Sequence, residues 1–69
     1  MPSSVIAGFD YDTDHATLTV VFVSGRIYRY FAVPAEVAAI FRKASSKGTY
    51  FNTHIRDRYP FREITAAPA

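Results

Sequence analysis

The stretch LTVVFVSGRIYRYFA, residues 18–32, decides the fold of this chain of 69 residues. Its first half alternates large apolar side chains with β-branched ones, a pattern typical of a β-strand. Ser24-Gly25 then reverses the chain, and residues 26–32 read as a return strand. The sequence therefore predicts an antiparallel hairpin near its centre.

The loop of this hairpin determines which side chains face the core. A two-residue loop is unfavourable at Ser24-Gly25, because a type I′ turn needs positive φ at both central positions and a type II′ turn needs glycine first. A three-residue loop of residues 23–25, with Gly25 left-handed in a G1 bulge, meets neither objection. Both tyrosines of the return strand are then expected on the core face. The expected pairs are Phe22 with Arg26, Val20 with Tyr28, and Leu18 with Tyr30.

The segments before and after the hairpin supply further elements. Residues 4–11 predict a strand that ends at a polar turn, residues 12–15. Val33-Pro34 starts an amphipathic helix, since proline lacks only a donor that the first helical turn leaves unpaired. Along the first strand, the side chains expected on one face are Val5, Ala7, Phe9 and Tyr11. Along the helix, those expected toward the sheet are Val37, Ile40, Phe41 and Ala44.

A second helix is expected from about residue 47 to residue 56, with Ser46 as its N-cap and with Phe51 and Ile55 facing inward. Residues 59–64 then read as a short extended segment, which Pro60 places at a sheet edge or strand start. The fold class is therefore α+β: a small antiparallel β-meander with two helices packed on one face and a short C-terminal strand. We expect one domain over residues 4–64, an N-terminal tail of residues 1–3 and a flexible C-terminal tail of residues 65–69.

Composition limits the classes of function. The chain has no cysteine, which excludes a disulfide framework, a zinc knuckle and a thiol nucleophile. The first charged residue is Asp10, and no apolar run is long enough to span a bilayer, so a cytoplasmic protein is expected. Residues 1–41 carry two basic and four acidic residues, a net charge of −2, whereas residues 42–69 carry six basic and two acidic residues, a net charge of +4. This asymmetry permits an anionic partner, although a solvated surface has the same appearance.

The order of the motifs resembles the KTSC domain, over residues 4–64. The motifs are Leu18-x-Val20-x-Phe22-x-x-Gly25-x-x-Tyr28-x-Tyr30, then Val33-Pro34, then Ala44-x-Ser46-x-Gly48-x-Tyr50-Phe51-Asn52-x-x-Ile55-Arg56-x-x-Tyr59. That family occurs alone in bacterial and phage proteins and at the C-terminus of some lysyl-tRNA synthetases, and the resemblance implies RNA binding only through this attachment. We therefore do not expect the tRNA context itself to carry over to this chain.

Two functional hypotheses follow, neither of them enzymatic. The first is a non-catalytic module that binds RNA or another nucleic acid through its basic C-terminal half, by bidentate arginine contacts to phosphate and a hydrogen bond from asparagine. Its candidate residues are Arg29, Lys47, Asn52, Arg56 and Arg58. Asn52 and Arg56 have an alternative structural role, which is to tie the second helix to the return strand. Tyr28 and Tyr30 are aromatic residues on one strand, on which unpaired bases could stack. The hairpin register instead favours a place for both rings in the core.

The second hypothesis is a protein-interaction or self-association module, with a homodimer as one form. The face of the sheet opposite the tyrosines is too apolar for a solvated surface. Its candidate residues are Val21, Val23, Ile27 and Phe31.

Catalytic, cofactor and metal sites are not expected. Residues 10–14 place acids as a calcium loop does, but His15 stands where the loop needs glycine and Val21 where it needs glutamate. His15 and His54 have no third ligand at metal spacing. No serine lies in a Gly-x-Ser-x-Gly motif, so a serine hydrolase is not expected.

Overall fold

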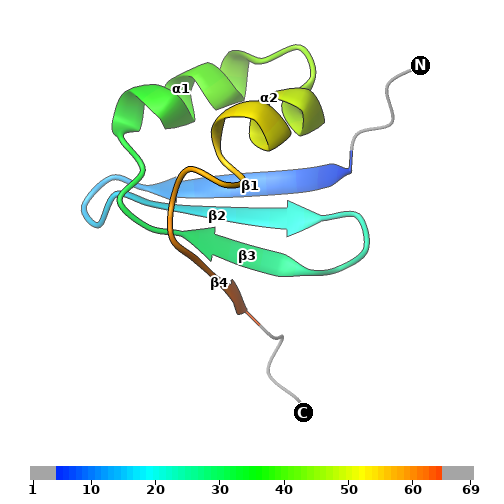
Figure 1. Ribbon diagram of the computed structural model, residues 1–69, viewed down its shortest axis with the longest axis horizontal. Helices are drawn as coiled ribbons and strands as arrows, with labels where there is room; N and C mark the ends of the chain where they lie inside the picture. Colours follow the sequence, from blue (N-terminus) through cyan, green and yellow to red (C-terminus); the bar gives the residue numbers. More distant parts are fainter. Residues whose placement is uncertain (1–4, 65–69) are drawn as a thin grey trace.

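A computed structural model describes residues 5–64. The two expected tails, residues 1–3 and 65–69, lie outside the described residues. The elements in chain order are β1 (Ile6–Asp12), β2 (Thr17–Phe22), β3 (Ile27–Tyr30), α1 (Ala35–Lys43), α2 (Lys47–His54) and β4 (Phe61–Ile64). The strands form one antiparallel sheet in the order β1-β2-β3-β4, with the two helices side by side (Figure 1). This is the predicted α+β class.

The β2–β3 hairpin has the predicted register. Val20 lies opposite Tyr28 and Leu18 opposite Tyr30. The Phe22 amide donates to the Arg26 carbonyl, with 2.8 Å between nitrogen and oxygen, and Gly25 has a φ of 95°. Loop chemistry therefore fixes the tyrosines on the same face as the buried residues of β2.

The first strand differs from its prediction at its start. The register of β1 against β2 shifts between Ile6 and Gly8, as in a β-bulge. Ile6 is buried while Val5 and Ala7 are exposed, so the expectation that those two residues share a face with Phe9 and Tyr11 was wrong. The extra residue of a bulge reverses the alternation on one side of it.

Both helices pack onto the same face of the sheet. Phe41 of α1 and Phe51 of α2 join Leu18, Val20 and Tyr30 in one buried cluster. The Ser46 hydroxyl accepts a hydrogen bond from the Thr49 amide, which is the predicted N-cap of α2. The last predicted strand is β4, which pairs with β3 at the sheet edge.

Helix α1 is rotated relative to its prediction. Its buried residues are Ala38 and Phe41, whereas Ile40 is 52% exposed. At about 100° per residue, a face centred on Val37, Ala38 and Phe41 turns Ile40 away from the sheet. The expectation that Ile40 packs in the core was therefore wrong.

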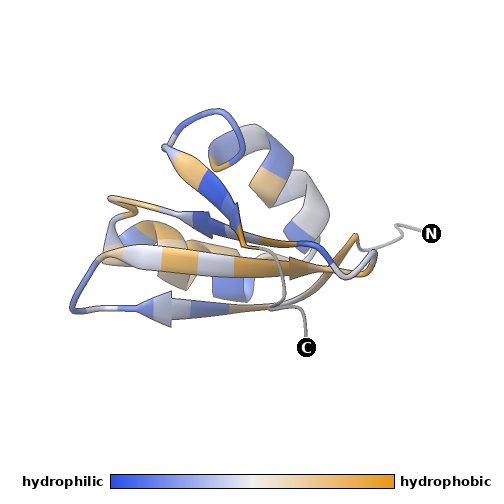
Figure 2. Cartoon of the chain, turned by 90° about the horizontal axis from the view of Figure 1, so that it is seen from below, coloured by the Kyte–Doolittle hydropathy of each residue, from blue (hydrophilic) through white to orange (hydrophobic). Residues whose placement is uncertain are grey.

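Hydrophobic residues follow much of the central strand, and hydrophilic ones gather at several turns (Figure 2).

Within residues 5–64, neither helix is long and apolar enough to cross a membrane.

Candidate functional site

A groove of about 650 Å³ opens between the helix-covered face of the sheet and α2. We call it the β3–α2 groove. Four separate segments of the chain contribute to it: the start of β1, the β2–β3 hairpin, α2 with the turn that follows it, and β4. Its lining residues are Val5, Phe22, Val23, Ser24, Arg26, Tyr28, Tyr30, Phe51, Asn52, Arg56, Asp57 and Phe61.

Aromatic rings form the apolar surface of the β3–α2 groove. Phe61 lies beside both tyrosines, with ring centroids 5.6 Å from Tyr28 and 5.4 Å from Tyr30. Phe51 approaches Tyr30 edge-on at 5.4 Å. Tyr30 is 3% exposed, but Tyr28 is only partly buried and Phe61 is 54% exposed. The groove thus combines a fixed inner ring with accessible outer ones, which is the arrangement a planar ligand needs for stacking.

The polar groups of the β3–α2 groove come from α2 and its C-terminal turn. Asn52, Arg56 and Asp57 line it, and all three are exposed. Burial raises the pKa of Tyr30 to about 12, and Tyr28 adds to the rise; the charge of Arg56 opposes it and that of Asp57 reinforces it. Both charged groups therefore act on the Tyr30 hydroxyl.

The rim of the groove carries a weak ion pair across two strands. Arg26 Nε lies 4.0 Å from Glu63 Oε2, and both side chains are substantially exposed. Solvent screens such a pair, so Arg26 stays available to an anionic ligand.

The five predicted nucleic-acid contacts lie in different places. Asn52 and Arg56 meet in the β3–α2 groove, where Tyr28 and Tyr30 also lie. Lys47 instead donates to the carbonyl oxygens at the end of α1, at 3.1 Å from Arg42 and 3.2 Å from Ala44. Arg58 is exposed beyond α2, outside the groove lining.

Arg29 is separated from the groove by the sheet itself. It alternates with the two tyrosines along β3 and lines a second hollow, of about 560 Å³, on the outer face. Phe31, Thr17 and Thr19 line the same hollow. The alternation of side chains along a strand accounts for this separation.

The predicted self-association residues do not form one patch. Val21 lies opposite Ile27 on the outer face, and Ile64 extends this apolar row onto β4. Val23 belongs to the loop and lines the β3–α2 groove. Phe31 lies at the other end of the outer face, beyond Arg29.

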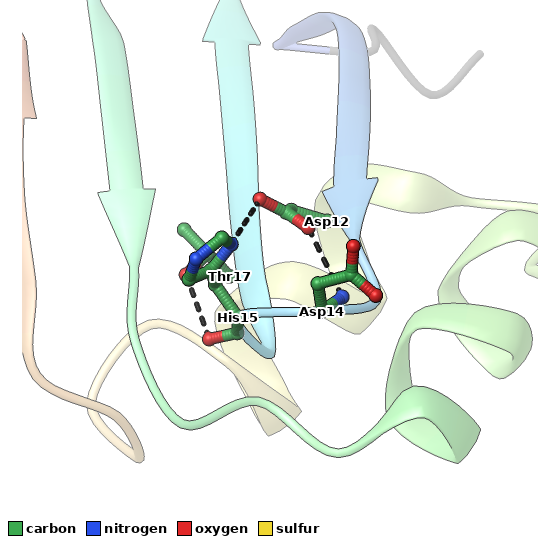
Figure 3. A network of polar contacts seen from close by, with 4 residues as sticks. All are labelled: Asp12, Asp14, His15 and Thr17. Atoms are coloured by element: carbon green, nitrogen blue, oxygen red, sulfur yellow. Dashed lines mark hydrogen bonds and ion pairs between the residues drawn. The ribbon is translucent and has the colours of Figure 1, made fainter.

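The acidic turn between β1 and β2 is held by local hydrogen bonds (Figure 3). The Asp12 carboxylate accepts from the Asp14 amide at 3.0 Å and contacts His15 Nδ1 at 2.8 Å, and this histidine hydrogen bond lowers the pKa of Asp12. The Thr17 hydroxyl donates to the His15 carbonyl at 3.0 Å. Within residues 5–64, His, Asp and Glu side chains form no group of three or more suited to a metal ion.

Arg26, Asp57 and Phe61 line the groove but were not among the functional residues predicted from the sequence. Arg26 directly precedes β3, Phe61 lies opposite Tyr30 on β4, and Asp57 follows Arg56 in the sequence. Strand pairing is the only signal that could have found Phe61, because Tyr30 lies opposite it. Asp57 had no such signal, since it belongs to an irregular turn after α2.

The described residues form a small α+β domain with a four-stranded antiparallel sheet and two helices on one face. The KTSC domain model matches residues 2–59. The chain belongs to the KTSC domain family, as its motifs predicted.

Relatives of known sequence or structure agree with this assignment. A KTSC domain protein from Yersinia pestis, known from its crystal structure, superimposes with a TM-score of 0.83 at 32% identity, over 94% of each chain. An uncharacterized protein of Stutzerimonas stutzeri is 42% identical over 75% of this chain and 73% of its own length. A lysine–tRNA ligase of Nostoc punctiforme is 40% identical over 90% of this chain, and the match spans 11% of the ligase.

Proposed function

We propose that this chain is a non-catalytic module that binds single-stranded RNA in the β3–α2 groove. The observation that carries the proposal is the convergence of Tyr28, Asn52 and Arg56, which come from separate elements, on one aromatic groove. Similarity to a region of lysine–tRNA ligases supports RNA as the nucleic acid. The positive charge of residues 42–69 favours a polyanion.

Each part of the groove has a role in this proposal. The partly exposed rings of Tyr28 and Phe61 stack on a base, which contributes about 1–3 kcal/mol per base. The Arg56 guanidinium contacts a phosphate through its planar fork. The Asn52 amide offers both a donor and an acceptor to a base or sugar. Stacking with few base contacts is typical of binding to unpaired RNA, whose bases are accessible.

A salt-dependent titration of fluorescein-labelled single-stranded RNA tests the proposal. The logarithm of the binding constant should fall linearly with the logarithm of salt concentration, and Arg56→Ala should reduce the slope by about 0.7, the value for one phosphate contact on a single strand. Arg29→Ala is the matched control. It removes the same exposed group from the opposite face of the sheet and should leave the slope unchanged.

Two results contradict the proposal. One is the absence of RNA affinity even at about 50 mM salt, where phosphate contacts are strongest. The other is the reverse pattern, in which Arg29→Ala flattens the slope and Arg56→Ala only lowers the melting temperature. That pattern would assign Arg56 the structural role of tying α2 to the sheet.

Self-association is a second candidate function, favoured by the apolar row on the outer face. Val21, Ile27 and Ile64 are neighbours on three adjacent strands, and no helix covers them. We propose that a second copy docks on this row, so that Val21→Lys converts a dimer into a folded monomer. Sedimentation of the native chain at 7.7 kDa at high concentration would exclude the dimer.

A further inference from the structure

Asp57 is the one acidic residue that lines the β3–α2 groove. Within residues 5–64, no lysine, arginine or histidine forms an ion pair with it, in contrast to Glu63 on the rim, which lies 4.0 Å from Arg26. Asp57 and Tyr30 line the same groove, and the charge of Asp57 contributes to the raised pKa of Tyr30. An unpaired carboxylate therefore borders an aromatic surface.

This carboxylate is unfavourable for a phosphate, because like charges repel each other. A groove that binds only the RNA backbone would be better without it. A carboxylate accepts hydrogen bonds and donates none. A base that stacks on these rings is therefore bound more favourably when it presents N–H donors toward Asp57.

Guanine fits this requirement best among the four bases. Its N1–H and N2–H₂ groups lie side by side on the Watson–Crick edge, so one carboxylate can accept from both, and unpaired RNA exposes that edge. Adenine has an acceptor, N1, at the corresponding position and is repelled. On its other edge guanine carries the acceptors O6 and N7, which the Asn52 N–H₂ group can reach as a donor.

We propose that the β3–α2 groove takes a guanine base, with Asp57 accepting from N1–H and N2–H₂ and Asn52 donating to O6 or N7. This assignment rests on the proposed RNA-binding function. Arg56 then contacts the adjoining phosphate, and the rings of Tyr28 and Phe61 stack on the guanine. The carboxylate then selects the base, whereas the arginine contributes affinity for any sequence.

Competition between related short RNAs tests the assignment. Labelled oligouridylates that differ only in one central nucleotide, guanosine, inosine or adenosine, are titrated at about 50 mM salt. The guanosine form should bind about tenfold more tightly than the adenosine form, and inosine, which lacks only the N2 amino group, should fall between them. Asp57→Asn should reduce the guanosine preference to about twofold or less.

Glu63→Gln is the matched control, since it removes the same charge from the rim without touching the groove lining. It should strengthen binding to all three RNAs alike by removing one negative charge from the rim, and should keep the preference for guanosine. Thermal melting of both variants confirms that they are folded.

The outcomes separate the two proposals. Equal affinity for guanosine and adenosine, or a preference that survives Asp57→Asn, overturns the guanine assignment and leaves RNA binding standing. Failure of all three RNAs to bind overturns both.

Discussion

Tyr28 and Tyr30 lie next to each other on the helix-covered face of β3, with ring centroids 6.5 Å apart and ring planes 26° from parallel, yet they occupy different environments. Tyr30 is 3% exposed and belongs to the buried cluster, whereas Tyr28 only packs against that cluster and lines the groove. In the Tyr-x-Tyr motif, the Tyr30 ring is therefore part of the core, whereas the Tyr28 ring is accessible to a ligand. The core position that the register predicted is thus fully reached by Tyr30, whereas Tyr28 packs against the core and stays partly exposed.

Truncating these rings should separate stability from binding. Tyr30→Ala should lower the free energy of unfolding by about 3–5 kcal/mol, because it leaves a cavity against Phe51. Tyr28→Ala should cost less, since its ring is partly exposed, but should weaken RNA binding by about 1–3 kcal/mol through lost stacking. Urea denaturation and RNA titration of both variants measure the difference. A larger loss of stability in Tyr28→Ala than in Tyr30→Ala would contradict the assignment.

The stability of the domain should fall at alkaline pH through Tyr30. Burial raises its pKa from 10.0 to about 12 in the folded state. The neutral phenol therefore stabilises the fold fully below about pH 10, and this contribution is lost as the pH rises toward 12. Ultraviolet absorbance of tyrosinate should show a step near pH 12 that belongs to Tyr30. Tyr30→Phe should remove this step and make the melting temperature less sensitive to pH between about 10 and 12. An unchanged titration curve in that variant would refute the assignment.

Lys47 should contribute to stability rather than to RNA binding. Its ammonium group donates to two carbonyls at the C-terminal end of α1, where a cation is favoured. Lys47→Ala should lower the free energy of unfolding by about 0.5–1.5 kcal/mol and leave the salt slope of RNA binding unchanged. Lys43→Ala is the comparison, because the Lys43 side chain is exposed and makes no hydrogen bond or ion pair within residues 5–64. A slope flattened by about 0.7 in Lys47→Ala would instead assign it a phosphate contact.

The hairpin loop should depend on the backbone of Gly25. Its φ of 95° is unfavourable for any residue with a Cβ, although an added Cβ would meet no atom within 4 Å. Gly25→Ala should therefore cost about 1–2 kcal/mol through backbone strain alone. Gly8→Ala is the matched control, because its Cβ also meets no atom within 4 Å and its φ is not left-handed. Equal melting temperatures for the two variants would argue against this loop geometry.

The parts of the fold that follow from local chemistry could be predicted from the sequence. Ser24-Gly25 admits only one favourable loop, and this fixed the register of both tyrosines. Ser46 is a strong N-cap, and it marked the start of α2. Pro60 indicated that the last segment lies at the sheet edge, and β4 pairs there with β3.

The parts that depend on packing between distant segments could not be predicted. Gly8 is only a weak signal of the irregularity between Ile6 and Gly8, so the exposed Ala7 looked like part of an apolar face. Ile40 fits a helical stripe as well as Ala38 does, and only the docking of Phe41 decides between them. The β3–α2 groove includes Asp57, which belongs to a turn outside any regular element, where periodicity carries no information.

RNA binding in the β3–α2 groove is tested most directly by a map of backbone amide chemical shifts in the ¹⁵N-labelled chain during titration with guanosine-containing single-stranded RNA. The largest changes are expected at Tyr28, Asn52, Arg56 and Asp57, around the β3–α2 groove, whereas Thr19 and Arg29 on the outer face should change little. Changes concentrated on Val21, Ile27 and Arg29, or no changes at any RNA concentration, would contradict it.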